Sequence, residues 1–249
     1  GVITGSAQYP GAAVLSTKAA VATGIGMVRF YSSSGLAHLV LHESPEVVVQ
    51  PGAVTSWLAG SGIVEDRFDD YTTWLRHRWF KVIERQSVPT VLDAGALGLA
   101  GKLSQPTLIT PHAGELSRIL KRLGTNVSAD EISDYPIEWA SEVANQLDVT
   151  VLLKGSKSVV VNNEIQIQLP AATPWLATAG SGDVLGGIIG AIAASNEIEI
   201  LNSDSRFAEI AASASFIHDQ SARLASKGGP ISASSIITRI PEAVRKILG

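Results

Sequence analysis

The sequence predicts an α/β protein with a doubly wound, mostly parallel sheet flanked by helices. Short runs of β-branched and apolar residues alternate with longer runs of helical periodicity. Several short runs are apolar throughout, as strands are when helices cover both faces of a parallel sheet. Small or polar residues follow one expected strand after another, at the edge where such sheets bind ligands. The chain shows neither a repeat nor a linker, so we expect a single domain over residues 1–249.

In the first half of the chain, the expected strands are runs of β-branched residues between turn-forming residues. An alanine-rich run over residues 12–23 predicts the first helix. Trp74, Trp79 and Val82 recur at helical spacing and predict a second helix over residues 69–85. The strands expected in this half are residues 2–4, 26–31, 46–49, 54–59 and 88–92.

The second half continues this alternation and then becomes helical. Residues 107–110 and the apolar run 149–153 are expected strands. Asn162-Asn163-Glu164 separates two further strands, 158–161 and 165–167, which is the pattern of a β-hairpin. The segment 195–203 has the composition of a loop between two helices. The helices expected in this half are residues 114–123, 136–147, 184–194, 206–224 and 234–248.

The composition argues against several classes of partner. The net charge is −4 and there is no basic tract, which argues against nucleic acid and against an anionic membrane. No apolar stretch reaches membrane-spanning length. The chain has no cysteine, so it can form neither disulfides nor thiolate metal sites. We therefore expect a cytoplasmic protein. Because the chain opens directly on an apolar strand, we also expect that residues preceding Gly1 are missing from it.

The most informative segment is Gly180-Ser181-Gly182-Asp183, which precedes an apolar helical run. Glycines let the backbone approach a ligand closely. The first N–H groups of a helix and its dipole together form an anion site. A carboxylate there has two interpretations: Asp183 can cap the helix, or it can be the general base for a hydroxyl that attacks a phosphoryl group. The flanking glycines favour the base, because a cap does not need them.

Two further strand ends carry candidate ligand groups. Gly60-Ser61-Gly62 is either a simple loop or a pocket of backbone N–H groups for an anion. In Thr110-Pro111-His112-Ala113-Gly114-Glu115, the histidine and the glutamate can stabilise the start of a helix, or they can face a ligand. In the second case His112 would donate to an amide or a phosphate, and Glu115 would help to hold Mg²⁺.

Two further strand ends carry charged residues at the edge of the sheet where we expect a ligand to bind. Lys154-Gly155-Ser156-Lys157-Ser158 is either a solvated entry to the hairpin or a site where a lysine and hydroxyls meet phosphate. Asp93 ends another strand, where it can cap the following turn or orient a metal or a substrate group. The chain has no Walker-type loop, so a nucleotide must be held in another way.

Taken in order, these motifs resemble the NAD(P)H-hydrate dehydratases, a family of the ribokinase-like superfamily. Each motif alone is weakly specific, but together they span nearly the whole chain in the order that the family shows. The motifs are Gly5-Ser6 with Tyr9-Pro10-Gly11-Ala12, Leu92-Asp93-Ala94-Gly95-Ala96-Leu97, Thr110-Pro111-His112-Ala113-Gly114-Glu115, Leu153-Lys154-Gly155-Ser156 and Gly180-Ser181-Gly182-Asp183-Val184-Leu185.

The resemblance implies a three-layer ribokinase-like fold and the repair of hydrated nicotinamide cofactors. The S epimer of NADHX or NADPHX would be dehydrated at the expense of ADP or ATP, with Mg²⁺. A phosphoryl group would move to the hydroxyl of the hydrate, and phosphate would then leave. The family often forms tetramers, so the resemblance also implies a homo-oligomer. Because the chain contains no epimerase domain, we expect a stand-alone enzyme that uses ADP.

The same resemblance assigns roles to individual residues. Asp183 would be the base that faces the substrate. The expected contacts with the hydrate are Ala12, Gly62, His112 and Asp183. The expected contacts with the adenine nucleotide are Lys154, Gly155, Ser156, Lys157, Ser158 and Gly182. Metal binding or support would fall to Asp93 and Glu115.

Two positions depart from the family pattern, and two other functions stay open. The family usually has proline where Ser61 stands, and it often has a second aspartate where Gly95 stands, which weakens the case for a metal there. One alternative is a kinase for a vitamin precursor of the hydroxymethylpyrimidine or hydroxyethylthiazole type, which would keep its phosphorylated product. The other is a non-catalytic module that binds adenine nucleotides, which would need no base.

Overall fold

The computed structural model describes residues 1–64 and 78–249, and its centre is a seven-stranded sheet with the strands in the order β1 to β7. Neighbouring strands from β1 to β5 are parallel, while β6 runs antiparallel to both β5 and β7. The mostly parallel sheet and the hairpin predicted from the sequence are thus confirmed. The strands are Val2–Ile3 (β1), Trp57–Ala59 (β2), Thr90–Leu92 (β3), Thr107–Ile109 (β4), Thr150–Leu153 (β5), Val159–Val161 (β6) and Gln166–Gln168 (β7).

The chain winds in two directions from β1. Phe30 forms a parallel bridge with Val2, and Val48 forms one with Arg29, so these segments extend the sheet beyond β1 on the side away from β2. The chain then returns to place β2 on the other side of β1. This reversal between β1 and β2 is the switch point at which doubly wound sheets bind their ligands. The prediction of strands over residues 26–31 and 46–49 is wrong, because these segments form only isolated bridges.

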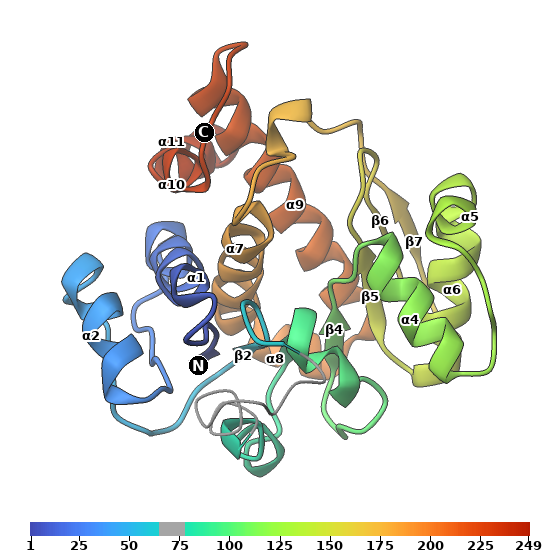
Figure 1. The fold of residues 1–249 in the computed structure, drawn as a ribbon, viewed down its shortest axis with the longest axis horizontal. Coiled ribbons are helices and arrows are strands. Elements are labelled where there is room, and N and C mark those ends of the chain that lie inside the picture. The colour runs from blue at the N-terminus through green and yellow to red at the C-terminus, as the bar shows by residue number, and fades with distance from the viewer. Residues whose placement is uncertain (65–77) are drawn as a thin grey trace.

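Two helical layers cover the sheet, as predicted (Figure 1). Alternate strand residues point to opposite faces. Leu58, Val91 and Leu108 pack in one core with the helices α1, α7 and α9, while Leu92 and Ile109 pack in the other with α4, α5 and α6. The helices are Pro10–Thr23 (α1), Ser34–Glu43 (α2), Ala113–Arg122 (α4), Ala129–Asp134 (α5), Pro136–Leu147 (α6), Ser181–Ser195 (α7), Glu197–Asn202 (α8), Asp204–Ser226 (α9), Ala233–Ile237 (α10) and Ile240–Leu248 (α11).

Several helix predictions need correction. The helices α2 and α5 were not expected, and α8 occupies the segment predicted to be a loop over residues 195–203. The single helix predicted over residues 234–248 is two helices, α10 and α11, with Pro241 in the first turn of the second. Proline is tolerated there because its missing N–H has no partner in a first turn.

Most of the helix predicted over residues 69–85 lies outside the described residues. Between residues 78 and 85 the chain is helical only over residues 78–80 and in the 3₁₀ turn Ile83–Arg85, so the helix does not continue unbroken to Arg85. Short 3₁₀ turns also cover Ala94–Leu99 and Pro174–Leu176. Among the helices described, none is long and apolar enough to cross a membrane.

Glycine lets α1 and α7 pack closely enough to set the position of the N-terminus of α7. A Cβ added to Gly187 would lie 2.3 Å from the carbonyl oxygen of Ser16 and 2.8 Å from the Cβ of Ala19. The two helices therefore touch through their backbones, and there is no room for a side chain between them.

We expect Gly187→Ala to lower the free energy of unfolding by about 1–3 kcal/mol, because the added methyl group forces apart two helices that have no flexible side chain to yield. Gly11→Ala, in α1, is the matched control: a Cβ there meets nothing within 4 Å, so its effect should be neutral or stabilising. Chemical denaturation of both variants measures the difference. Equal stability of the two variants would contradict the close packing.

Candidate active site

A buried ion pair joins the ends of two strands at the centre of the candidate site. Asp93 follows β3 and Lys154 follows β5, and the ammonium Nζ lies 2.8 Å from the carboxylate Oδ1. Asp93 is 5% exposed. Its carboxylate also accepts hydrogen bonds from the hydroxyls of Thr110 (2.8 Å) and Ser61 (2.9 Å). The ends of four neighbouring strands thus converge on one carboxylate.

Electrostatics fix the charges of this pair. Burial by itself raises the pKa of Asp93, but the Lys154 charge and the hydrogen bonds from Lys154, Thr110 and Ser61 outweigh it and hold the pKa below its ordinary value. Burial lowers the pKa of Lys154, but the carboxylates of Asp93, Glu115 and Asp183 raise it overall. Asp93 is therefore an anion and Lys154 a cation. Asp93 precedes the 3₁₀ turn Ala94–Leu99 without capping it by a side-chain hydrogen bond.

The N-terminus of α7 faces this ion pair. Gly180 precedes the helix with φ = 85°, a conformation that glycine adopts without strain. A Cβ added to Gly182 would lie 3.7 Å from Nζ of Lys154, which places the first turn of the helix beside the ammonium group. Free N–H groups, the helix dipole and a fixed cation therefore meet at one point, where they favour an anion such as phosphate.

Asp183 lies in that first turn and has a perturbed pKa. Burial raises its pKa, the Asp93 charge raises it further, and Lys154 lowers it in part; the result is about 6. Gly180 occupies the N-cap position of α7 and Asp183 is the third residue of the helix, so Asp183 is not the N-cap. A carboxylate poised near neutral pH beside an anion site has the properties of a general base.

His112 and Glu115 serve the start of α4, which was the structural interpretation of the two residues. Nδ1 of His112 accepts from the backbone N–H groups of Gly114 (3.1 Å) and Glu115 (3.4 Å). The Glu115 carboxylate in turn accepts from the backbone N–H of His112 at 2.9 Å. This reciprocal capping box occupies both side chains. His112 also lines the cavity next to α7 that is described below, so its capping role is compatible with contact to a bound ligand.

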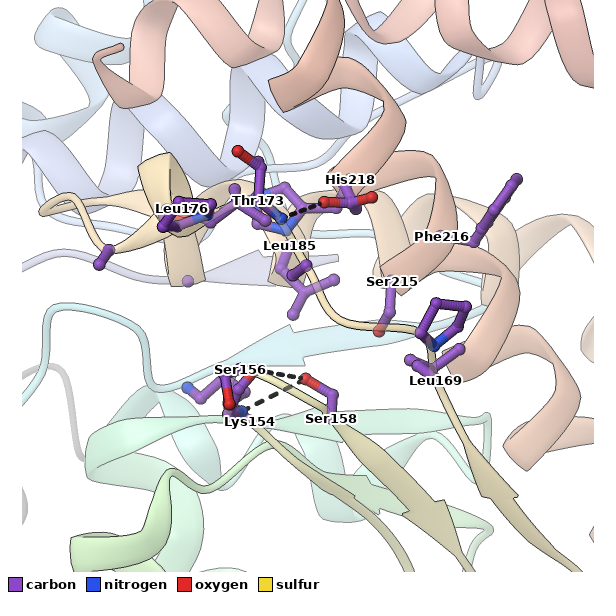
Figure 2. Close-up of a pocket in the computed structure, with 18 of the residues that line it drawn as sticks. Lys154, Ser156, Ser158, Leu169, Thr173, Leu176, Leu185, Ser215, Phe216 and His218 are labelled. Atoms are coloured by element: carbon purple, nitrogen blue, oxygen red, sulfur yellow. Dashed lines mark hydrogen bonds between the residues drawn. The ribbon is translucent and has the colours of Figure 1, made fainter. Parts of the chain in front are cut away.

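A cavity of about 950 Å³ lies next to the N-terminus of α7 (Figure 2). One wall is the turn between β5 and β6, with Lys154, Ser156 and Ser158, and α9 lies on the opposite side. Of the residues assigned to the nucleotide, those that line the cavity are Lys154, Gly155, Ser156, Ser158 and Gly182. Lys157 is exposed and does not line this cavity.

Ala12 and Gly62, the other two residues assigned to the hydrate, lie together at the switch point. A Cβ on Gly62 would be 2.4 Å from the Cβ of Ala12 and 3.2 Å from the Cα of Gly5, and Gly62 has φ = 69°. Neither Ala12 nor Gly62 lines the cavity described above. Since Gly186, one turn after Asp183, faces the Oγ of Ser61 in the neighbouring loop, α7 packs beside this second region as well.

The two departures from the family pattern have structural explanations. Ser61 is buried, and its hydroxyl donates to Asp93 while its carbonyl accepts from the N–H of Gly5 at 2.7 Å. The serine therefore ties the loop to the ends of β1 and β3. At Gly95 a Cβ would lie 2.4 Å from the carbonyl oxygen of Ile63, so this backbone has no room for a second aspartate.

The described residues do not provide a cage for a metal ion. Within residues 1–64 and 78–249, no group of three or more histidine or acidic residues is placed to hold one. Asp93 already accepts from three donors, and Glu115 caps α4. The described residues therefore form no ready-made cage of three or more such ligands, and the metal role of Asp93 and Glu115 stays a prediction.

Six residues of α9 line the cavity although sequence reasoning missed them: Ser215, Phe216, His218, Asp219, Gln220 and Arg223. Nε2 of the buried His218 lies 3.3 Å from the Ser181 hydroxyl, and burial lowers the pKa of His218 to about 4. Asp219 accepts from the backbone N–H of Thr173 at 2.7 Å. Arg223 donates to Asp219 and to the carbonyl of Ala171 (2.9 Å), and Gln220 also lines the cavity.

The sheet between its two helical layers is a ribokinase-like α/β fold, and an acidic side chain lies in the first turn of a helix at its ligand-binding edge. A model of the NAD(P)H-hydrate dehydratase family matches residues 1–242, and the chain belongs to that family.

Curated relatives agree with this assignment. The bifunctional NAD(P)H-hydrate repair enzyme Nnr of Mycobacterium tuberculosis is 38% identical over 210 residues, which are 78% of this chain and 40% of the relative. The protein of the same name from Corynebacterium glutamicum is 33% identical and covers 99% of this chain and 47% of its own length. This chain thus spans less than half of these bifunctional relatives. The ADP-dependent (S)-NAD(P)H-hydrate dehydratase of Neisseria meningitidis is 28% identical over 98% of this chain and 82% of the relative.

Solved structures share the fold. The ADP/ATP-dependent NAD(P)H-hydrate dehydratase of Bacillus subtilis, co-crystallised with ATP and Mg²⁺, superposes with a TM-score of 0.78 at 23% identity, covering 98% of this chain and 88% of that one. A hydroxyethylthiazole kinase of Pyrococcus horikoshii superposes with a TM-score of 0.63 at 15% identity, covering 98% and 86%. At these identities the likeness concerns the fold alone.

Proposed function

We propose that this chain dehydrates the S epimer of NADHX or NADPHX back to NADH or NADPH at the expense of ADP or ATP. The observation that carries the proposal is the position of Asp183: a carboxylate with a pKa near 6 in the first turn of α7, beside Lys154 and the large cavity. Membership of the dehydratase family and the names of the relatives support the choice of substrate.

In the proposed reaction, the adenine nucleotide occupies the cavity with its phosphates toward Lys154 and Gly182. The ammonium group and the N–H groups at the start of α7 stabilise the charge on the transferring phosphoryl group. Asp183 accepts the proton of the hydrate's hydroxyl as its oxygen attacks the terminal phosphorus. The bond between that phosphorus and the bridging oxygen breaks, so ADP leaves as AMP, or ATP as ADP.

The second step removes the phosphate. The lone pair of the ring nitrogen expels the phosphate from the adjacent carbon, and loss of a proton from the next carbon restores the double bond of the ring. Phosphate is a much better leaving group than hydroxide, which is why the dehydration consumes a nucleotide. Ala12, Gly62 and His112 hold the hydrate in this proposal. Ala12 and Gly62 lie outside the cavity proposed for the nucleotide, whereas His112 also lines it.

The finer assignments are part of the same proposal. Mg²⁺ enters with the nucleotide, because magnesium is commonly held by substrate phosphates with few protein ligands. ADP is the proposed co-substrate, and the name of the ADP-dependent relative from Neisseria meningitidis supports that choice. The protein assembles as a homo-oligomer, a tetramer by family resemblance, and works in the cytoplasm.

A coupled assay tests the function. Purified protein, S-NADHX, ADP and Mg²⁺ should produce NADH, seen as an absorbance increase near 340 nm, together with one phosphate per NADH. Omission of ADP is the control. If the protein ignores NADHX and converts a hydroxymethylpyrimidine or hydroxyethylthiazole to a stable phosphate ester, it is instead a kinase for a vitamin precursor. If it binds ADP without turning over either substrate, the binding-module alternative holds.

The pH dependence follows from the pKa of Asp183. Only the ionised carboxylate can accept a proton, so kcat/KM for the hydrate should rise as pH increases through about 6 and become level above about 7. His218, with its pKa lowered to about 4, stays neutral across this range and cannot cause the change. Initial rates at saturating ADP between about pH 5 and 8 measure the profile. A rate that is constant or falls between about pH 5 and 7 would argue against Asp183 as the base.

A further inference from the structure

The cavity next to α7 has two chemically different ends. Lys154 and Gly182 form the end that favours phosphate, while Leu169, Pro170 and Phe216 line it elsewhere with apolar surface. Figure 2 shows Leu169 and Phe216 away from Lys154. With the phosphates of a nucleotide at the charged end, the base extends toward the apolar residues, where its faces lose contact with water.

The face of α9 toward this cavity carries six residues, and most of them already have partners. Ser215 donates to the carbonyl of Ala211 in its own helix. His218 lies at hydrogen-bond distance from Ser181. Asp219 and Arg223 bind each other. Asp219 also accepts from the backbone N–H of Thr173, and Arg223 donates to the carbonyl of Ala171, in a segment that lines the cavity.

Phe216 and Gln220 are the two residues of this face left to meet a ligand. They are four positions apart in one helix, so they lie on neighbouring turns of the same face. Gln220 is half-buried and lines the cavity, and the described part of the chain supplies no hydrogen-bond partner for its side-chain amide. A half-buried amide one turn away from Phe216 on the cavity-lining face of α9 is placed to bind a polar group of the ligand.

We propose that Gln220 selects adenine, with Phe216 supplying apolar contact to the base. This inference rests on the proposed use of an adenine nucleotide. A glutamine amide offers one donor and one acceptor side by side, which matches N7 and the exocyclic amino group of adenine. Hypoxanthine carries a carbonyl oxygen in place of that amino group, so one of the two hydrogen bonds is lost and two acceptors face each other.

Calorimetric binding of ADP and IDP, without any hydrate present, tests this assignment. Wild-type protein should bind ADP about 10-fold or more tightly than IDP, and Gln220→Met should bring the two dissociation constants to within about 3-fold by weakening ADP. Phe216→Ala should weaken the binding of both nucleotides and leave the ratio of their dissociation constants unchanged. Gln146→Met, at an exposed position on α6, is the matched control and should change neither.

The outcomes separate this inference from the proposed function. If Gln220→Met weakens the binding of ADP and IDP equally, or leaves both dissociation constants unchanged, Gln220 does not discriminate between the two bases. The dehydratase can still use ADP in that case. A wild-type protein that binds ADP and IDP equally well also overturns the inference alone. If the wild type binds neither nucleotide, both the inference and the proposed function are wrong.

Discussion

The Asp183→Asn variant is expected to lose about 10²- to 10⁴-fold in kcat while it still binds ADP, because asparagine has nearly the same shape but cannot accept a proton. The Lys154 ammonium and the start of α7 remain in place to hold phosphate. Turnover of S-NADHX and calorimetric ADP binding measure the two properties separately. Full activity of the variant would show that Asp183 is not the base.

The same substitution should stabilise the free protein near neutral pH. The pKa of Asp183 in the folded chain is about 6, above its ordinary value of 3.8, so the folded state disfavours the ionised carboxylate. Stability therefore falls as pH rises from about 4 to about 6, and the loss remains at higher pH. The neutral asparagine of the variant carries no such loss, and the gain is on the order of 2 kcal/mol at pH 7–8. Chemical denaturation at about pH 4 and pH 8 should show the gain at the higher pH only.

Lys154→Met is the second substitution with a large expected effect. It leaves the Asp93 carboxylate buried without its cation, and removing one partner of a buried pair costs about 3–5 kcal/mol. The variant should also bind ADP much more weakly, since the cation beside Gly182 is gone. Denaturation curves and calorimetry measure the two effects.

The double variant Asp93→Asn/Lys154→Met separates stability from binding. It removes both charges. The Thr110 and Ser61 hydroxyls bind different oxygens of Asp93, so one of them can still donate to the asparagine oxygen and the other can accept from the asparagine NH2, and most of the lost stability should return. ADP binding should stay weak because no cation is restored. Recovery of ADP binding in the double variant would contradict a phosphate-binding role for Lys154.

The sequence predicts the layers of the fold well because its periodic patterns are local. Apolar strand runs and the helices α1, α6 and α7 lie within a few residues of their expected positions. The extension of the sheet beyond β1 is different: residues 26–31 and 46–49 have the composition of strands but form only the single bridges Phe30–Val2 and Arg29–Val48. Pairing depends on what lies opposite a segment, which its own composition does not contain.

For the site, the sequence indicates residues that follow strands but not the contacts between them. Asp93 and Lys154 were recognised separately, yet their ion pair joins positions 61 apart in the chain and needs the strand order to be predicted. His218, Asp219 and Gln220 were missed because α9 begins some twenty residues after Asp183 and carries no glycine-rich signature. The one available signal was a cluster of polar residues on a largely buried helix.

The central claim is that the hydroxyl of the hydrate attacks a phosphoryl group at the start of α7. S-NADHX with ¹⁸O in that hydroxyl, incubated with ADP and the enzyme, tests it most directly. If the hydroxyl is phosphorylated and then expelled, the carbon–oxygen bond breaks and mass spectrometry should find the ¹⁸O in inorganic phosphate. Recovery of the ¹⁸O in water, with unlabelled phosphate, would contradict the account.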